Sequence, residues 1–335
     1  MSRAASSRVE PGRVRELVRG FADCRVLVFG DFMLDRYVWG SVDRISPESP
    51  VPVVVVDRES TMLGGAGNVA RNLASLGAAV EVVTVVGDDA AARELERLMA
   101  GWKIPTDGFV VDPGRPTTEK TRVIARNQQV VRYDRESDQP IDAAAAQAVL
   151  EAVRERAARV HGVVIEDYDK GMLAREVVES AMATFREAGV RCFVDPKAEP
   201  WQVYTGAELV KPNLREAAEL ARTRVRSDED LEHVGRVVVE TTGAGMVAIT
   251  RGEEGMDLFG ADGWFEHVPA HRRGVSDLAG AGDTSIAVLT LARLSGATWS
   301  EAARLAVGAA GFVVSVPGTA TLTPDDLIGA MREQR

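Results

Sequence analysis

The chain has 335 residues, of which 45% are hydrophobic, and this length suits one large α/β domain or two small ones with a sizeable core. The formal net charge is −10, from 50 acidic and 40 basic residues, which argues against nucleic acid or an anionic membrane surface as the main partner. Two cysteines, a polar N-terminus and the lack of a long apolar segment predict a cytoplasmic protein without a disulfide framework, signal peptide or membrane span.

Apolar, β-rich segments alternate with helical patterns along the chain. We expect strands at 25–30, 80–86, 162–165, 191–194 and 247–250, and helices at 64–76, 89–99, 143–159 and 176–188. Strands that are apolar on both faces and separated by helices are typical of a parallel sheet covered on both sides. The pattern therefore predicts an α/β fold with a doubly wound, mostly parallel sheet.

Two segments, at about 37–58 and 117–134, interrupt this alternation. The first contains a strand pattern at 51–56 with no helix before it, and the second reads as a hairpin of 120–125 and 129–133. We expect both to form one small sheet that lies over the main body as a lid, within a single domain spanning 1–335. An exposed edge of that sheet would favour a homodimer.

Polar residues follow the first predicted strand and open the next helix. Asp31 and Asp35 come after the strand at 25–30, where an α/β sheet binds its ligand, and carboxylates are strong acceptors for sugar hydroxyls. Gly64 and Gly65 would let a ligand approach the backbone, and Asn68 can both donate and accept. An exposed acidic turn and an asparagine that only faces the helix start remain alternatives.

Three further polar clusters, at 167–171, 195–197 and 211–216, follow successive strands and predict one continuous rim. Lys170 and Lys197 would offset phosphate charge. Asn213 and Glu216, three residues apart at a helix start, would hold a hydrated Mg²⁺ near nucleotide phosphates. The alternative for Glu216 is simple charge complementarity with the helix N-terminus.

Residues 250–255 follow the strand at 247–250 and contain two glycines. A nucleotide would lie against backbone there, and the predicted contacts are Thr250, Gly252 and Gly255. Taken alone, this segment is equally well explained as a hairpin turn.

The most informative segment is 276–284, which runs directly into the apolar helix pattern at 286–294. The small residues Gly280, Ala281 and Gly282 leave amide groups uncovered at a helix N-terminus, which attracts anions. A carboxylate such as Asp283 beside this turn repels a phosphate, so its presence there needs a chemical reason. That reason would be removal of a proton from the hydroxyl that attacks the phosphate. The alternative is that Asp283 is only a helix N-cap.

Together, the motifs at 64–68 and 280–283 resemble those of the ribokinase-like family of carbohydrate kinases, and the resemblance extends over about 26–323. Within that family, the longer stretches at 30–37, 44–53 and 120–129 are similar to the heptose-7-phosphate kinases of bacterial surface-sugar synthesis.

This resemblance implies phosphoryl transfer from MgATP to the anomeric hydroxyl of D-glycero-D-manno-heptose 7-phosphate. The product would be the 1,7-bisphosphate, used for ADP-heptose and lipopolysaccharide synthesis. Asp283 would be the catalytic base, and the amides of Ala281 and Gly282 would stabilise the developing charge. Arg126 and Asn127 would join the sugar pocket, and Asp277 would begin a loop that binds a monovalent cation such as K⁺.

The chain departs from the family pattern at Ala279, where threonine is common, and at Val307, where asparagine is common. Many relatives carry a second, nucleotidyl-transferring domain, so with the chain ending at Arg335 we expect that activity from another protein. A kinase for another sugar phosphate, such as a fructose phosphate, and a catalytically silent sugar-binding protein remain alternatives. A nicotinamide dehydrogenase fits poorly, because the first strand leads to Gly-Asp-Phe-Met rather than Gly-x-Gly-x-x-Gly.

Overall fold

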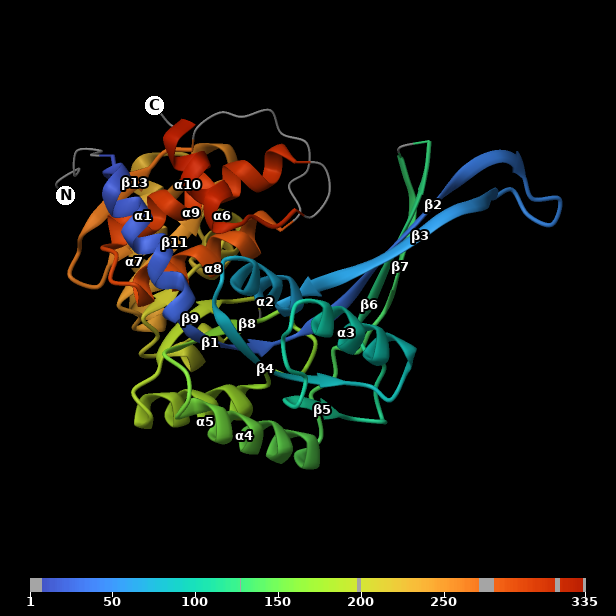
Figure 1. Ribbon diagram of the computed structural model, residues 1–335, viewed down its shortest axis with the longest axis horizontal. Helices are drawn as coiled ribbons and strands as arrows, with labels where there is room; N and C mark the ends of the chain where they lie inside the picture. Colours follow the sequence, from blue (N-terminus) through green and yellow to red (C-terminus); the bar gives the residue numbers. More distant parts are fainter. Residues whose placement is uncertain (1–7, 127, 198–199, 271–279, 317–319, 334–335) are drawn as a thin grey trace.

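The computed structural model describes residues 8–126, 128–197, 200–270, 280–316 and 320–333. In these ranges the main sheet has nine strands in the order β13-β12-β11-β10-β9-β8-β1-β4-β5, parallel except for the antiparallel β12 and β13 (Figure 1). The strands are β1 (Arg25–Gly30), β4 (Ala79–Val86), β5 (Phe109–Val111), β8 (Gly162–Glu166), β9 (Arg191–Asp195), β10 (Leu209–Val210), β11 (Met246–Thr250), β12 (Met256–Gly260) and β13 (Phe265–Val268). This architecture confirms the predicted doubly wound α/β class.

Helices cover both faces of the main sheet and bury a separate apolar cluster on each. They are α1 (Pro11–Gly20), α2 (Ala66–Ser75), α3 (Ala90–Gly101), α4 (Ala143–Ala157), α5 (Arg175–Glu187), α6 (Leu214–Leu220), α7 (Asp228–Thr242), α8 (Ala281–Leu294), α9 (Trp299–Ser315) and α10 (Pro324–Glu333), with short 3₁₀ turns at Phe21–Asp23, Trp201–Tyr204 and Gly252–Glu254. Strand β1 shows how the faces divide: Val26 and Val28 pack with the apolar residues of α8 and α9, while Leu27 and Phe29 pack with those of α4 and α5. A strand that is buried on both faces accounts for the continuous apolar run in its sequence.

A second sheet, which we call the lid sheet, has the order β3-β2-β6-β7. Its strands are β2 (Phe32–Ile45), β3 (Pro52–Gly65), β6 (Glu119–Ala125) and β7 (Gln128–Arg135). In Figure 1 the long β2–β3 ribbon and the β6–β7 hairpin extend away from the main sheet. On one face Tyr37 and Trp39, two residues apart on β2, stack with ring centroids 5.5 Å apart. The lid sheet exposes apolar side chains, namely Ile45, Val51, Val55, Val56, Val130, Val131 and Tyr133.

Two local expectations are corrected by the structure. Gly64 and Gly65 end strand β3 rather than begin a helix, and α2 starts at Ala66. Strand β2 begins at Phe32, so Asp35 lies on the lid sheet and not at the end of β1. The glycines are needed where β3 returns beside β2: a Cβ on Gly64 would overlap the Asp35 carboxylate, and Gly65 has a φ of 54°.

The two cysteines, Cys24 and Cys192, are both buried and free. Among the described residues, no helix combines the length and apolarity that crossing a membrane would require.

Candidate active site

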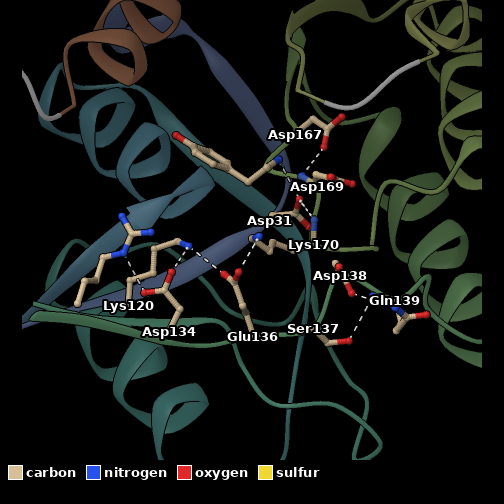
Figure 2. A network of polar contacts seen from close by, with 12 residues as sticks. Asp31, Lys120, Asp134, Glu136, Ser137, Asp138, Gln139, Asp167, Asp169 and Lys170 are labelled. Atoms are coloured by element: carbon tan, nitrogen blue, oxygen red, sulfur yellow. Dashed lines mark hydrogen bonds and ion pairs between the residues drawn. The ribbon is translucent and has the colours of Figure 1, made fainter.

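Asp31 lies at the junction of β1 and β2 and is buried, with 4% of its surface exposed. Its Oδ2 accepts hydrogen bonds from the backbone N–H groups of Tyr168, at 2.9 Å, and Lys170, at 3.2 Å (Figure 2). Burial, reinforced by the nearby Asp167, raises the pKa of Asp31 to about 7. The alternative of an exposed acidic turn is therefore wrong for this residue.

Asp35 projects from the lid sheet and is paired with an arginine that the sequence analysis did not single out. The Nη1 of Arg122, on β6, lies 2.5 Å from Asp35 Oδ1, and its guanidinium lies 5.4 Å from the ring centroid of Tyr37. Register explains this contact, because β2 and β6 run parallel with Asp35 opposite Lys120 and Tyr37 opposite Arg122. The lid sheet therefore presents both an acceptor and a cation on one face.

The N-terminus of α8 has the geometry of an anion site. Its N-cap is Gly280, at a φ of 80°, and among the described residues no side chain caps the helix. A Cβ built on Gly282 would lie 3.8 Å from the ammonium nitrogen of Lys211. The first turn of α8, which no described side chain caps, and a lysine thus converge on one place, as a phosphate group would require.

Asp283 lies within the first turn of α8 and is not its cap, so its carboxylate is available for other contacts. Its Oδ2 accepts a 2.5 Å hydrogen bond from Asn68 Nδ2, and its Oδ1 accepts a 3.1 Å bond from the Tyr168 hydroxyl. Burial raises the pKa of Asp283, while these two donors and the charge of Lys211 act in the opposite direction. A carboxylate in this environment combines raised basicity with a fixed orientation.

Buried charges surround Asp283 on the main-sheet side. Lys211, only 3% exposed, places its Nζ 2.6 Å from Asp195 Oδ2. Burial lowers the pKa of Lys211, but Asp195 and Glu166 outweigh that effect, and the net shift is upward. Burial raises the pKa of Asp195 to about 6 and that of Glu166 well above its ordinary value. One lysine therefore neutralises a site that is otherwise rich in carboxylates.

Each of the three predicted phosphate-binding cations is paired with a carboxylate. Lys170 contacts Glu136 at 3.1 Å, in a network that continues to Lys120 and Asp134 (Figure 2). Lys197 contacts Glu216 at 3.0 Å, and Arg126 contacts Asp43 at 3.1 Å. Arg126 lies at the exposed turn between β6 and β7, with 73% of its side chain exposed. Arg126 thus follows the outer end of β6, whereas Asp31 lies near the inner end of the lid sheet, where β6 begins.

Asn213 and Glu216 form a reciprocal cap at the start of α6. Asn213 Oδ1 accepts from the Glu216 N–H at 2.9 Å, and Glu216 Oε2 accepts from the Asn213 N–H at 3.0 Å. This reciprocal hydrogen bonding is a capping box, which the sequence analysis did not anticipate; its alternative for Glu216 was only charge complementarity with the helix N-terminus. Both carboxylate oxygens of Glu216 therefore have a protein partner, because Oε1 accepts from Lys197 and Oε2 from the Asn213 N–H.

The turn after β11 contains the predicted nucleotide contacts. Thr250 pairs with Asn213, which brings this turn beside the start of α6. Gly252 and Gly255 have φ values of 57° and 102°, and a Cβ on Gly255 would overlap the backbone of Val268. Glycine is therefore required at 255 by the turn itself, whatever binds nearby.

Some of the residues that the sequence analysis named fall outside the described part of the chain. These are Asn127, Asp277 and Ala279. Val307 is buried on α9.

Three residues at the site were missed by the sequence analysis. Tyr168 and Lys211 both belong to the polar clusters predicted at strand ends. The sequence therefore indicated where they lie but not that they contact or adjoin Asp283. Arg122 alternates with Lys120 along β6, and that period of two could have placed both on one face of a strand.

The chain is similar to known proteins over most of its length. Residues 24–326 match the model of the pfkB family carbohydrate kinases. The chain is 44% identical over 319 residues to the bifunctional protein HldE of Paramagnetospirillum magneticum, covering 95% of this chain and 65% of that protein. It is 42% identical to the HldE of Geobacter metallireducens, covering 96% of this chain and 66% of the relative. The chain thus spans about two thirds of the length of the curated relatives it matches.

Solved structures share the fold at lower sequence identity. Phosphofructokinase-2 from Escherichia coli, in complex with potassium, superposes with a TM-score of 0.76 at 21% identity, covering 93% of this chain and all of that one. Arabidopsis thaliana ribokinase, complexed with ribose and ATP, gives a TM-score of 0.73 at 20% identity, covering 92% and 99%. With a family match over nearly its whole length and this fold, the chain belongs to the pfkB family of carbohydrate kinases.

Proposed function

We propose that the chain transfers the γ-phosphoryl group of ATP to the anomeric hydroxyl of D-glycero-D-manno-heptose 7-phosphate, giving the 1,7-bisphosphate. The location of Asp283, in the uncapped first turn of α8 and next to Lys211, carries the chemical part of this proposal. The choice of sugar is supported by the heptose-kinase-like segments at 30–37, 44–53 and 120–129 and by relatives named HldE at 44% and 45% identity.

In this reaction the attacking hydroxyl gives its proton to Asp283, its oxygen bonds to the γ-phosphorus, and the bond to the leaving oxygen of ADP breaks. Asn68 and Tyr168 hold the carboxylate so that it faces the hydroxyl. The amides at the start of α8 and the Lys211 ammonium stabilise the negative charge on the phosphoryl oxygens. Asp31 and Asp35 accept hydrogen bonds from the sugar hydroxyls.

The donor set fits Mg²⁺, which in nucleotide sites binds one or two carboxylates together with phosphates and waters. Glu166 has a buried carboxylate oxygen, Oε2, without a hydrogen-bond partner among the described residues, and Asp195 and Glu216 lie on neighbouring elements. We propose that Glu216, whose two oxygens already accept from Lys197 and Asn213, would hold the ion through its water ligands, and that the ion would neutralise charge on the nucleotide phosphates. A K⁺ ion beside residue 277 rests on the resemblance, and phosphofructokinase-2 has been solved with potassium.

For the phosphate of the sugar we favour Arg122 over Arg126. Both are paired with a carboxylate, but the partner of Arg122 is Asp35, which we place in the sugar pocket, whereas Arg126 and Asp43 lie at an exposed turn. We further propose a homodimer formed through the lid sheet, which exposes large apolar side chains (Ile45, Val51, Val55, Val56, Val130, Val131 and Tyr133). Sedimentation of wild type and of the double variant Val55→Lys/Val131→Lys tests the dimer. A variant that sediments like the wild type contradicts it.

The function itself is tested by measuring ATP consumption with a panel of heptose, hexose and pentose phosphates, followed by phosphorus NMR of the product. We expect the highest kcat/KM with heptose 7-phosphate and a new anomeric phosphate signal. The Asp283→Asn variant, purified in parallel, controls for contaminating kinases. A higher kcat/KM with a fructose phosphate would replace the sugar assignment, and no turnover with any sugar would favour a silent binding protein.

A further inference from the structure

Asn68 is held by two neighbours on its own helix that the reaction described above does not use. Its Oδ1 accepts a 2.6 Å hydrogen bond from Arg71 Nη2 and a 3.4 Å bond from Asn72 Nδ2. The three residues stand at positions i, i+3 and i+4 of α2, so they share one face of the helix. Because its oxygen is occupied in this way, the amide nitrogen of Asn68 is the end that faces Asp283.

The network closes on the residue that follows Asp283. Asn72 donates to the backbone oxygen of Asn68 at 2.9 Å, and its own Oδ1 accepts from the Thr284 hydroxyl at 3.1 Å. The orientation of each amide is thereby fixed by a partner on each side. Helix α2 and the first turn of α8 are thus connected by a ring of hydrogen bonds that passes through the Asp283 carboxylate.

We propose that Arg71 and Asn72 are positioning residues that fix the amide of Asn68 as a hydrogen-bond donor to Asp283. The inference rests on the proposed role of Asp283 as the base. With the amide reversed, Asn68 would present a carbonyl oxygen to the carboxylate, which would repel it and turn it away from the attacking hydroxyl.

The cost of burying these groups supports a specific role. Arg71 is 8% exposed and Asn72 is fully buried, although their neighbours Val69, Ala70 and Leu73 are apolar, as core helix positions normally are. Burial lowers the pKa of Arg71, and the charge of Asp283, followed by that of Asp35, raises it. The Arg71 guanidinium therefore stays close enough to the base to influence its charge.

The test compares Arg71→Met, which removes the donor, with Arg71→Lys, which keeps one. We expect Arg71→Met to lower kcat about tenfold, with the KM for ATP and for sugar phosphate changed less than about threefold. Arg71→Lys should restore most of kcat. The same Arg71→Met change made in an Asn68→Ala background should cause a smaller loss, because the part of its effect that passes through Asn68 is already absent and only its direct charge effect on Asp283 remains.

The pH–rate profile supplies a readout that packing alone would not move. Loss of the Asn68 donor should shift the acid limb of kcat to higher pH, since the ionised base is then less stabilised. The other groups that act on Asp283 are unchanged in these variants, namely Asp35 on β2, Glu166 at the end of β8, Tyr168, Asp195 at the end of β9 and Lys211. Thr284→Val, nearly equal in volume, removes the donor to Asn72 and should give a smaller shift in the same direction. It serves as the second variant if Arg71→Met does not fold, as judged by thermal unfolding.

Three outcomes overturn the proposal. They are a raised KM for sugar phosphate with an unchanged kcat, an additive loss in the Asn68→Ala background, and an unchanged kcat with an unchanged acid limb. All variants are assayed with whichever sugar phosphate the wild type turns over, so a wrong sugar does not affect the result. Full activity of Asp283→Asn would instead contradict the base assignment in the proposed function.

Discussion

The Asp283 carboxylate is held by neutral donors within the molecule, whereas Arg126 and Asp43, at the outer end of the lid sheet, are exposed and paired with one another. Asn68 and Tyr168 each donate to one oxygen of Asp283. By contrast, Arg126 and Asp43 have side chains that are 73% and 71% exposed. Buried contacts of the first kind set protonation and geometry, while exposed ion pairs contribute little. Substitutions in the first region should therefore change the chemical step, and those in the second should change binding at most.

The largest effect is expected for Asp283→Asn, which keeps the shape of the side chain but cannot accept the proton. Loss of a general base typically lowers kcat by about 10² to 10⁴-fold. Steady-state kinetics and ATP binding by calorimetry, measured on the same preparation, separate the loss of chemistry from the loss of binding. Wild-type turnover in this variant would contradict the assignment of the base.

Arg122→Ala should have the next largest effect, because it removes the cation that faces Asp35 from the lid sheet. A charge-assisted contact is worth about 1.5–3 kcal/mol, so kcat/KM for the sugar phosphate should fall by about one to two decades. The KM for ATP should stay within a few-fold of the wild-type value. Equal losses for a phosphorylated and an unphosphorylated sugar would mean that Arg122 positions Asp35 and does not bind phosphate.

Tyr168→Phe should lower the rate mainly at low pH. The tyrosine hydroxyl donates to Asp283 and lowers its pKa, so its removal raises that pKa further. The base is active when ionised, and activity is lost as the pH falls through its pKa; the acid limb of kcat should therefore move to higher pH. At the plateau above it, kcat should fall by less than about tenfold. An acid limb that moves to lower pH would contradict this account.

Arg126→Ala is expected to have the smallest effect, within about threefold on every kinetic constant, since its partner Asp43 is equally exposed. Asp43→Ala is the matched control, because it breaks the same pair from the other side. A rise of a decade in the sugar KM for Arg126→Ala, with Asp43→Ala unchanged, would show that the turn between β6 and β7 contacts a sugar site. The contrast between the two regions would then fail.

Elements set by their own local sequence could be predicted, whereas features that depend on a neighbouring strand could not. Strand β1 occupies the range expected from its apolar run, and α3 begins directly after Asp89, which caps it. Gly64 and Gly65 were placed in a helix because glycine pairs are compatible with a helix start, and only the neighbouring strand reveals why a side chain cannot fit there.

At the site, motifs along the chain singled out Asp31, Asn68 and Asp283 but not the contacts that orient the two carboxylates. Asn68 and Asp283 are separated by 215 residues, and their contact depends on how α2 packs against α8. Such pairings follow from tertiary packing, which no local pattern encodes. The pairing of Lys197 with Glu216 is of the same kind, although both residues had been singled out from the sequence.

The junction at Asp31 has a consequence for how the protein responds to its ligand. The backbone N–H of Asp31 donates to the carbonyl of Glu166 on β8, its own carbonyl accepts from the N–H of Ala66 on α2, and its carboxylate binds two amides of the segment after β8. A sugar that pulls on this carboxylate therefore acts at once on two segments far apart in the chain, the start of α2 and residues 166–170. Sugar binding should thus slow hydrogen–deuterium exchange at the amides of Ala66, Tyr168 and Lys170 together, as a single cooperative unit.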